Sequence, residues 1–274
     1  MSATPAARSA GWPEAPGALG SVGLLARRTA ALCLAELSRI RHDRTELYMR
    51  AIQPALWLLI FGETFTHIHA IPTGDVPYLD YLAPGIMAQS ALFISIFYGI
   101  QIIWDRDAGI LAKLMTTPTP RAALVTGKAF AAGVRSTAQV FVVLVLSAIL
   151  GVTFDWNVGH IALSVVAVVL GSVFFTTLSV SIAGLVLTRD RLMGIGQAIT
   201  MPLFFASNAL YPVALMPAWV RGVALINPLS YEVNALRRLL LGMPGNLWLD
   251  FGVLVLAAVL GVSVASSLLG RLAR

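Results

Sequence analysis

The chain has 274 residues, of which 58% are hydrophobic and 12% are charged. A typical soluble domain carries about 25% charged residues, so this composition excludes a soluble fold of the same length. Long apolar stretches are therefore interpreted as membrane spans, which need about 20 residues each. The net charge of +6 could favour a nucleic-acid partner, but the basic residues lie at the edges of the apolar stretches. We therefore expect contact with membrane lipid and no nucleic-acid partner.

The predicted fold is an all-α membrane protein with six transmembrane helices. The apolar stretches cover approximately residues 51–65, 84–104, 130–152, 161–187, 193–210 and 247–269. The second and fifth stretches contain Pro, Gly, Gln and Ser, which favour a broken or partly re-entrant helix. The fourth carries small residues that allow close helix contact, namely Gly171, Ser172, Ser179, Ser181 and Gly184.

Basic residues are distributed unevenly between the two sides of the predicted spans. Three of the 19 Lys and Arg residues lie on one side, namely Arg221, Arg237 and Arg238. The other side holds Arg8, Arg27, Arg28, Arg39, Arg41, Arg44, Arg50, Arg106, Lys113, Arg121, Lys128, Arg135, Arg189, Arg191, Arg271 and Arg274. By the positive-inside rule the larger group is cytoplasmic. We therefore expect a multi-pass protein of the bacterial inner membrane with both termini in the cytoplasm.

Two segments precede the first span. Residues 1–20 are rich in Ala, Pro and Gly and lack an apolar core, so we interpret them as a disordered tail rather than a signal peptide. Residues 21–274 are expected to form a single transmembrane domain. Residues 22–49 mix leucines with charges and predict a helix along the cytoplasmic interface, with an ordinary soluble helix as the alternative. Cys33 is the only cysteine, so an intrachain disulfide is excluded.

The segment between the second and third spans predicts a short cytoplasmic helix. Asp105 and Asp107 are expected at its start, where carboxylates favour a helix N-terminus, and Pro118 is expected to end it. Its apolar residues share one helical stripe, namely Ile110, Leu111, Leu114 and Met115. Three turns cannot span a bilayer, so the helix must lie on the membrane or dock into the groove of a partner. The alternative is a solvated connector.

Residues 216–241 predict a pair of short helices on the outer side. Pro217, Asn227 and Pro228 break the stretch into two pieces, neither of which is long enough to span a bilayer. Apolar residues of the first piece are expected to enter the outer leaflet while Arg221 stays in water. These apolar residues are Trp219, Val220, Val223 and Leu225.

Charged and metal-binding residue types are sparse near the spans. Glu232 precedes Arg237 and Arg238 by one to two helical turns, and we expect mutual neutralisation rather than substrate binding. His67 and His69 stand two residues apart in an outer loop without a further ligand, so no metal site is predicted.

Two motifs, in this order on six spans, carry a family resemblance. The first contains an acid, a Gly, spaced Leu and Met residues, a Pro, an Arg and a Gly-Lys pair, at Asp107, Gly109, Leu111, Met115, Thr117, Pro118, Arg121, Gly127 and Lys128. The second runs from Asn227 through Pro228 to Tyr231 and continues with Ala235, Leu236 and Arg237. Together they resemble the type-2 ABC exporter permeases, and within that family the nodulation-factor and daunorubicin-resistance permeases.

The resemblance covers about residues 30–269 and implies a permease domain that acts as a homodimer with two separate ABC ATPase subunits. It implies that ATP and Mg are bound by the partner, with no cofactor in this chain. The implied coupling residues are Asp107, Gly109, Leu111, Leu114, Met115 and Pro118. The outer gate would include Asn227, Pro228 and Tyr231. The expected substrate is amphipathic: a lipid-linked glycan, a lipo-oligosaccharide or a hydrophobic drug.

ATP hydrolysis and other enzyme chemistry are not expected in this chain. Lys128 follows a Gly, but Ala122 and Ala129 stand where the phosphate-binding loop GxxxxGK[ST] requires Gly and Ser or Thr. The sequence also lacks the HExxH, GxSxG and CxxC motifs. A gradient-driven carrier, an intramembrane enzyme and a scaffold remain the alternatives to an ATP-driven exporter. No acidic residue lies in the middle of the third, fourth or sixth span, which disfavours proton coupling.

Overall fold

The computed structural model describes residue 34 and residues 52–68, 71–74, 76–115, 121–186 and 188–272. In this described part every regular element is a helix, which confirms the all-α class. The elements are η1 (Trp57–Gly62), α3 (Glu63–Ile68), α4 (Tyr78–Asp107), α5 (Ile110–Met115), α6 (Arg121–Ile149), α7 (Val158–Val186), α8 (Arg189–Phe205), η2 (Val213–Leu215), α9 (Ala218–Ile226), α10 (Pro228–Leu241) and α11 (Leu247–Leu272). The predicted tail and, apart from residue 34, the predicted interfacial helix lie outside the described residues.

Four helices, α4, α6, α7 and α11, are long and apolar enough to cross a membrane. They correspond to the second, third, fourth and sixth predicted spans. The expectation that the second stretch is broken or partly re-entrant is wrong, because α4 runs without interruption from Tyr78 to Asp107 and includes Pro84. Proline removes one backbone hydrogen bond of a helix, and almost every residue from Tyr78 to Leu92 is buried against neighbouring helices. Packing therefore holds α4 continuous.

The first and fifth predicted spans correspond to shorter helical stretches. Residues 52–68 are helical throughout, with the π-helix η1 between an α-helical start and α3. The fifth stretch forms α8, which begins at Arg189 and ends at Phe205, before the predicted boundary at residue 210. Pro202 lies in its last turn, and the carbonyl of Pro202 accepts the Ala206 N–H as the helix closes. Neither stretch is among the helices that meet the length and hydropathy of a span.

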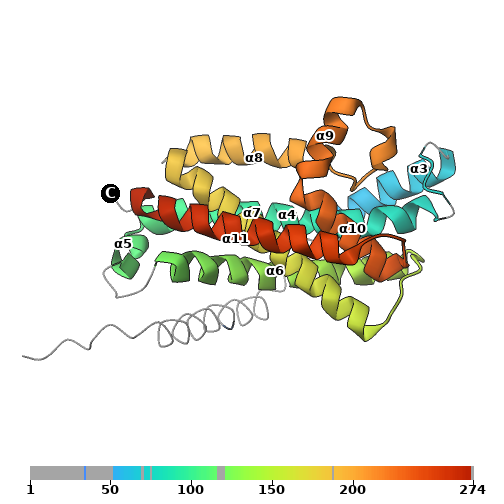
Figure 1. Ribbon diagram of the computed structural model, residues 1–274, viewed down its shortest axis with the longest axis horizontal. Coiled ribbons are helices and arrows are strands. Elements are labelled where there is room, and N and C mark those ends of the chain that lie inside the picture. The colour runs from blue at the N-terminus through green and yellow to red at the C-terminus, as the bar shows by residue number, and fades with distance from the viewer. Residues whose placement is uncertain are drawn as a thin grey trace, which may run out of the picture.

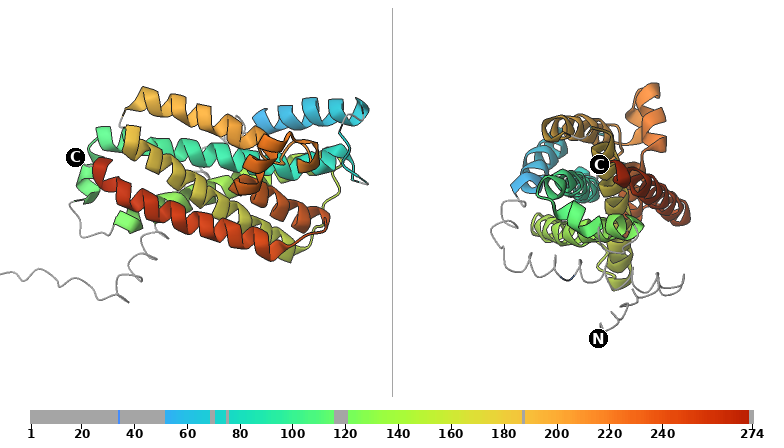
Figure 2. Two further views of the ribbon diagram at one scale, coloured as in Figure 1. Left: turned by 45° about the horizontal axis from the view of Figure 1, so that its top comes forward. Right: turned by 90° about the vertical axis from the view of Figure 1, so that its left-hand side faces the viewer.

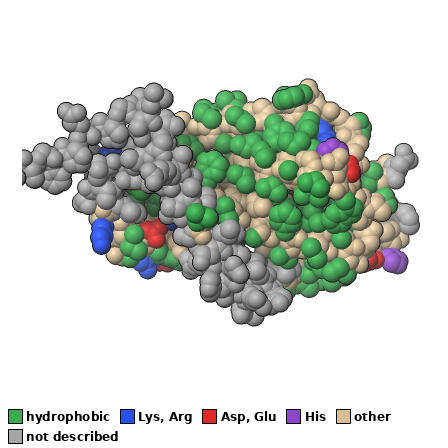
Figure 3. All heavy atoms as spheres, turned by 90° about the horizontal axis from the view of Figure 1, so that it is seen from below, with side chains coloured by type: hydrophobic (Ala, Val, Ile, Leu, Met, Phe, Trp, Pro, Cys, Tyr) green, Lys and Arg blue, Asp and Glu red, His purple; other side chains and the backbone are tan. Residues whose placement is uncertain are grey.

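The long helices lie side by side in one elongated bundle (Figures 1 and 2). The short helix α5, the start of α8 and the C-terminal end of α11 lie at one end of this bundle, and α3 lies at the opposite end. Figure 3 shows apolar side chains over the middle of one face and charged side chains near the two ends. This distribution is typical of a protein whose middle is surrounded by lipid.

Small residues allow α7 to approach its neighbours closely. Gly99 of α4 faces Ser179 of α7 without room for a side chain, and the Ser179 hydroxyl donates to the Ile96 carbonyl at 2.8 Å. Gly184 also approaches Leu268 of α11 closely, since a Cβ added at Gly184 would lie 3.1 Å from the Leu268 Cβ. The close contacts predicted for the fourth span are therefore made within this chain.

Candidate functional site

The segment predicted as a coupling helix begins with a turn between α4 and α5. Gly109 has φ of +71°, a left-handed conformation that favours glycine. Its N–H donates to the Arg106 carbonyl at 2.9 Å, and its carbonyl accepts the Lys113 N–H at 3.1 Å. The helix itself covers Ile110–Met115. A short helix thus follows a tight turn, as the Gly109 position allows.

The expectation that Asp105 and Asp107 begin this helix is wrong, because both belong to the last turn of α4. The mostly apolar stretch from Ile100 to Trp104, whose isoleucines are buried, keeps α4 helical up to these carboxylates, and Gly109 is the point where the chain reverses. Both carboxylates instead bind other helices. Asp105 accepts from Lys128 Nζ of α6 at 2.6 Å, and Asp107 accepts from Arg189 Nε of α8 at 2.6 Å.

The apolar side chains of α5 divide between the core and the surface. Leu111 is buried in the main hydrophobic core of this chain, whereas Ile110 is 50% exposed. Among the apolar side chains of α5 that the structure describes, Ile110 is therefore the one accessible to a partner. Leu111 instead holds α5 against the bundle. The side chains of Leu114 and Met115, together with Pro118, lie outside the described part of the structure.

The helix pair that was expected on the outer side is broken where the sequence predicts, at Asn227 and Pro228. Helix α9 ends at Ile226, and α10 begins with Pro228 in its first turn, a position that suits proline because no intrahelical N–H is needed there. Asn227 Oδ1 accepts the Leu229 N–H at 3.0 Å, which caps α10. The Tyr231 hydroxyl donates to the Leu225 carbonyl at 2.7 Å, which fixes the angle between the two helices.

Asn227 also joins the pair to α8. Its Nδ2 donates to the Leu203 carbonyl at 2.7 Å and to the Ala206 carbonyl at 3.4 Å. Carbonyls at a helix C-terminus lack intrahelical partners, so one buried side chain satisfies both the end of α8 and the start of α10. A displacement of α8 along its axis would therefore lengthen or break the hydrogen bonds between Asn227 and the end of α8.

The first helix of the pair exposes a mostly apolar surface. Its exposed large side chains are Trp219, Val223, Leu225 and Ile226. Arg221 folds back and donates to the carbonyls of Ala214 and Met216 at 3.2 and 3.4 Å. The arrangement suits insertion into a lipid leaflet with the guanidinium kept at the interface.

The expectation that Glu232 pairs with Arg237 or Arg238 is wrong. Arg237 is buried over the Tyr81 ring, 3.4 Å from its centroid, and donates to the carbonyls of Tyr81 and Ala209 at 3.1 and 3.0 Å. Burial lowers the pKa of Arg237 to about 10, so it stays cationic at neutral pH. Arg238 pairs instead with Asp250 of α11.

Glu232 is left as a fully buried carboxyl group. It lies against Gly171 of α7, where a side chain would have no room. Neither of its oxygens has a hydrogen-bond partner in the described part of the chain. Burial raises the pKa of Glu232 well above its usual range, because a carboxylate is costly away from water. Burial therefore favours the neutral form of this group.

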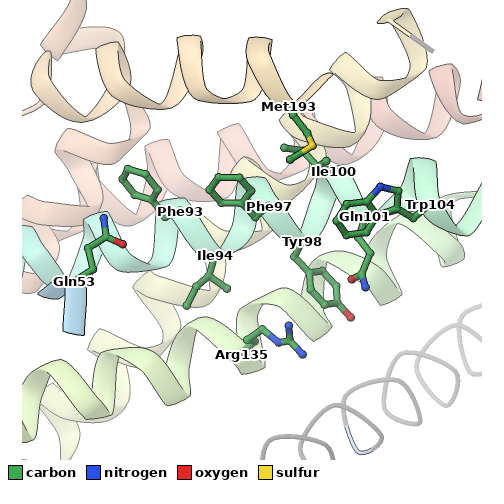
Figure 4. A pocket seen from close by; sticks show the side chains of 10 residues that line it. All are labelled: Gln53, Phe93, Ile94, Phe97, Tyr98, Ile100, Gln101, Trp104, Arg135 and Met193. Atoms are coloured by element: carbon green, nitrogen blue, oxygen red, sulfur yellow. The ribbon is translucent and has the colours of Figure 1, made fainter. Parts of the chain in front are cut away.

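A cavity of about 380 Å³ opens beside α4 (Figure 4). Its described lining combines four aromatic residues, three aliphatic residues, two amides and one cation: Phe93, Phe97, Tyr98, Trp104, Ile94, Ile100, Met193, Gln53, Gln101 and Arg135. In Figure 4 the Tyr98 ring points toward Arg135 of α6. The sequence does not predict this cavity, since its walls come from four separate helical stretches. The available signal was Arg135, a cation inside a predicted span.

The chain is similar to a known protein family and to several known proteins. Residues 27–241 match the family described as ABC-2 type transporter. The chain is 30% identical over 188 residues to the transport permease ycf38 of Cyanophora paradoxa, covering 68% of this chain and 64% of that protein. The chain thus spans just under two thirds of the length of the ycf38 relatives.

Two further relatives have names with a functional meaning. The daunorubicin resistance ABC transporter permease protein DrrB1 of Streptomyces coeruleorubidus is 25% identical over 85% of this chain and 81% of its own length. Nodulation protein J of Rhizobium leguminosarum bv. viciae is 27% identical over 72% of this chain and 76% of its own. With a family match over most of its length and four helices able to span a bilayer, the chain belongs to the ABC-2 type transporter family of membrane permeases.

Proposed function

We propose that this chain is the membrane subunit of an ATP-driven exporter, with two copies of the chain acting together with two ABC ATPase subunits. Permeases of this family work with an ABC ATPase partner. ATP and Mg would be bound by that partner. The proposal is carried by the presence of two elements in one chain. The short helix α5 follows α4 at one end of the bundle, and the broken pair α9–α10 follows α8 at the end of that helix farther from α5.

The proposed orientation places α5 and both termini in the cytoplasm of a bacterial cell. The support comes from the basic residues Arg106, Lys113, Arg189 and Arg271, which belong to helix ends that gather near α5. Residues 52–68 and α8 would complete six spans together with the four long helices. The α9–α10 pair would enter the outer leaflet without crossing it.

The proposed mechanism uses α8 as the link between the two ends. Closure of the ATPases would move α5, and Asp107 would pass this movement to Arg189 at the start of α8. A helix of 17 residues is about 25 Å long, so its far end reaches the outer pair. There Leu203 is hydrogen-bonded to Asn227, which would shift the gate formed by Asn227, Pro228 and Tyr231. Coupling requires such a physical element between sites.

The proposed substrate is an amphipathic molecule, such as a lipid-linked glycan, a lipo-oligosaccharide or a hydrophobic drug. The name of the DrrB1 relative refers to resistance against a drug, which supports the last of these classes. An aromatic cavity beside α4 is also compatible with an apolar portion of the substrate.

The test is purification of the tagged chain from its own host under mild conditions, followed by measurement of ATP hydrolysis with added amphipathic compounds. We expect a complex with two copies of each subunit and hydrolysis that rises with substrate. Transport that continues without any ATPase would favour a gradient-driven carrier. One copy of this chain with two ATPase subunits would contradict the homodimer.

A further inference from the structure

Glu232 of α10 faces α7 at a place that offers no polar partner. It is fully buried, and a Cβ added at Gly171 would overlap its carboxyl group. Side chains three or four residues apart are neighbours on a helix, so the sequence gives the surroundings of both residues. All of these neighbours are apolar: Pro228, Leu229, Ala235 and Leu236 on α10, and Ala167, Val168, Phe174 and Phe175 on α7. A buried acid without a partner is rare in folded proteins and requires an explanation.

The contacts of α10 differ from one neighbour to the next. Toward α4 and the chain after α8, Arg237 donates to the carbonyls of Tyr81 and Ala209 at 3.1 and 3.0 Å. Toward α11, Arg238 pairs with Asp250. Toward α7, the described residues of the two helices form no hydrogen bond or ion pair, and the contact consists of apolar packing around the buried carboxyl group. Helix α10 can therefore separate from α7 without breaking a polar contact between these two helices.

No neighbouring charge compensates the Glu232 carboxyl group. Every charged or titratable side chain described on α10 and on the adjoining parts of α4, α7 and α11 has a partner other than Glu232. These side chains are Tyr78, Asp80, Tyr81, His160, Tyr231, Arg237, Arg238 and Asp250. The Glu232 oxygens have no hydrogen-bond partner in the described part of the chain. Its protonation therefore depends on burial and on the access of water rather than on a nearby cation.

The protonation of Glu232 and the contact between α10 and α7 depend on each other. While the contact is closed, burial raises the pKa of Glu232 well above its ordinary value of 4.5. Once the contact opens, water reaches the carboxyl group and the pKa returns toward its ordinary value. Above about pH 4.5, and up to the raised pKa, the closed contact holds a proton that the open contact releases to water. A rise in pH therefore favours opening, by up to about tenfold per pH unit for one proton.

We propose that Glu232 is a proton-binding site that controls the contact between α10 and α7, so that uptake of a proton closes the contact and loss of the proton opens it. The inference deepens the proposed function and rests on it, because α10 carries the gate residues Pro228 and Tyr231. Opening beside α7 would free the start of α10 to move together with Asn227. The gate would therefore open more readily at alkaline pH and stay closed at acidic pH.

The test measures the distance between α7 and the start of α10 in the full chain, in phosphatidylcholine nanodiscs without an ATPase. In a Cys33→Ser background, nitroxide spin labels are attached through Val166→Cys and Ile226→Cys, two positions whose side chains are exposed. Double electron–electron resonance then gives the populations with the shorter and the longer distance between pH 4 and pH 8. We expect the ratio of longer to shorter distances to be constant near pH 4 and to rise by up to about tenfold per pH unit above about pH 4.5.

Three variants separate the role of Glu232 from that of packing in general. Glu232→Gln keeps the size of the side chain but cannot ionise, so the shorter distance should persist from pH 4 to pH 8. Gly171→Ala places a methyl group where the carboxyl group lies, so the longer distance should be present already at pH 4. Gly252→Ala on α11 is the matched control, because nothing lies within 4 Å of a Cβ added there, and it should behave as the unmodified protein does.

Histidines also change charge between pH 5 and 8, so a fourth variant combines His67→Gln, His69→Gln and His160→Gln and should keep the pH dependence. A distance that does not change with pH in the unmodified protein would overturn the inference. A pH dependence that disappears in the histidine variant, or that persists in Glu232→Gln, would overturn it as well. If Glu232→Gln does not fold, the unmodified protein, the histidine variant and Gly171→Ala decide the question.

The outcome of this test is separate from that of the exporter proposal. Since no ATPase is present in the nanodiscs, the distances do not depend on whether the chain is an exporter. Failure of the exporter proposal would appear instead as the lack of an ATPase in the purified complex.

Discussion

The joint at Asn227 allows the proposed link through α8 to be tested with a single side chain. This residue accepts a hydrogen bond from Leu229 at the start of α10 and donates one to Leu203 near the end of α8. Serine at this position can still cap α10, but it is too short to reach the α8 carbonyl. Asn227→Ser therefore removes the link and keeps the cap, whereas Asn227→Ala removes both.

The magnitudes follow from the two hydrogen bonds. Loss of an N-cap costs about 1 kcal/mol, and loss of an internal hydrogen bond costs about another 1 kcal/mol. The Ala variant should therefore lose about 2 kcal/mol of stability and the Ser variant about half of that. A loss of about 1 kcal/mol in the link changes a coupled equilibrium roughly fivefold. We expect the Ser variant to export about fivefold more slowly at normal membrane abundance.

The assay is substrate efflux from vesicles that contain the permease and its ATPase, together with membrane abundance and thermal stability. Asn157→Ser is a matched control, since Asn157 caps the start of α7 by accepting the Gly159 N–H at 2.9 Å and is exposed. It should leave export unchanged. If Asn227→Ser exports as fast as the unmodified protein at equal abundance, α8 does not transmit the movement through this joint.

Three further predictions concern docking, burial and topology. Ile110→Asp should weaken binding of the ATPase at least tenfold in co-purification, since burying such a side chain contributes about 1.5–3 kcal/mol. Leu111→Asp should instead unfold the α5 turn and lower the abundance of the protein in the membrane. Burial raises the pKa of Glu232 well above its ordinary value of 4.5, so the folded chain holds more protons than the unfolded chain and its stability falls as pH rises above about 4.5. Glu232→Gln should remove this fall and raise the melting temperature at neutral pH but not at pH 4, and an unchanged pH profile would contradict it. In a cysteine-free background, a Cys at Gly74 should react with an impermeant reagent in intact cells and one at Lys113 should not; the reverse pattern would invert the proposed orientation.

Features encoded by neighbouring residues were predictable from the sequence. The four long spans follow from continuous apolar stretches, and the break between α9 and α10 follows from Asn227 and Pro228, which cap and begin a helix in almost any context. Gly109, which takes a left-handed conformation at no steric cost, also marks the turn before α5 in the sequence, although the helix was expected to begin earlier, at Asp105 and Asp107. Each of these signals acts within one or two helical turns, so no knowledge of the packing was needed.

The carboxylates at the end of α4 show where local signals fail. Asp105 and Asp107 suit a helix N-terminus by charge, but the structure places them in the last turn of α4, where the dipole disfavours them. Lys128 and Arg189, from α6 and α8, compensate by pairing with them at 2.6 Å. Those partners are far away in the sequence, so only the fold reveals why the acids are tolerated there.

The contacts of Glu232 could be predicted from the sequence only in part. Side chains five or six residues apart lie on different faces of a helix, because contact requires a spacing of three or four. The distances in sequence to Arg237 and Arg238 therefore already argued against pairing. The residue that Glu232 does meet, Gly171, lies on another helix and has no side chain that could signal the contact. Because burial favours the neutral form of Glu232, a movement that admits water beside α7 would favour ionisation and oppose return to the packed state.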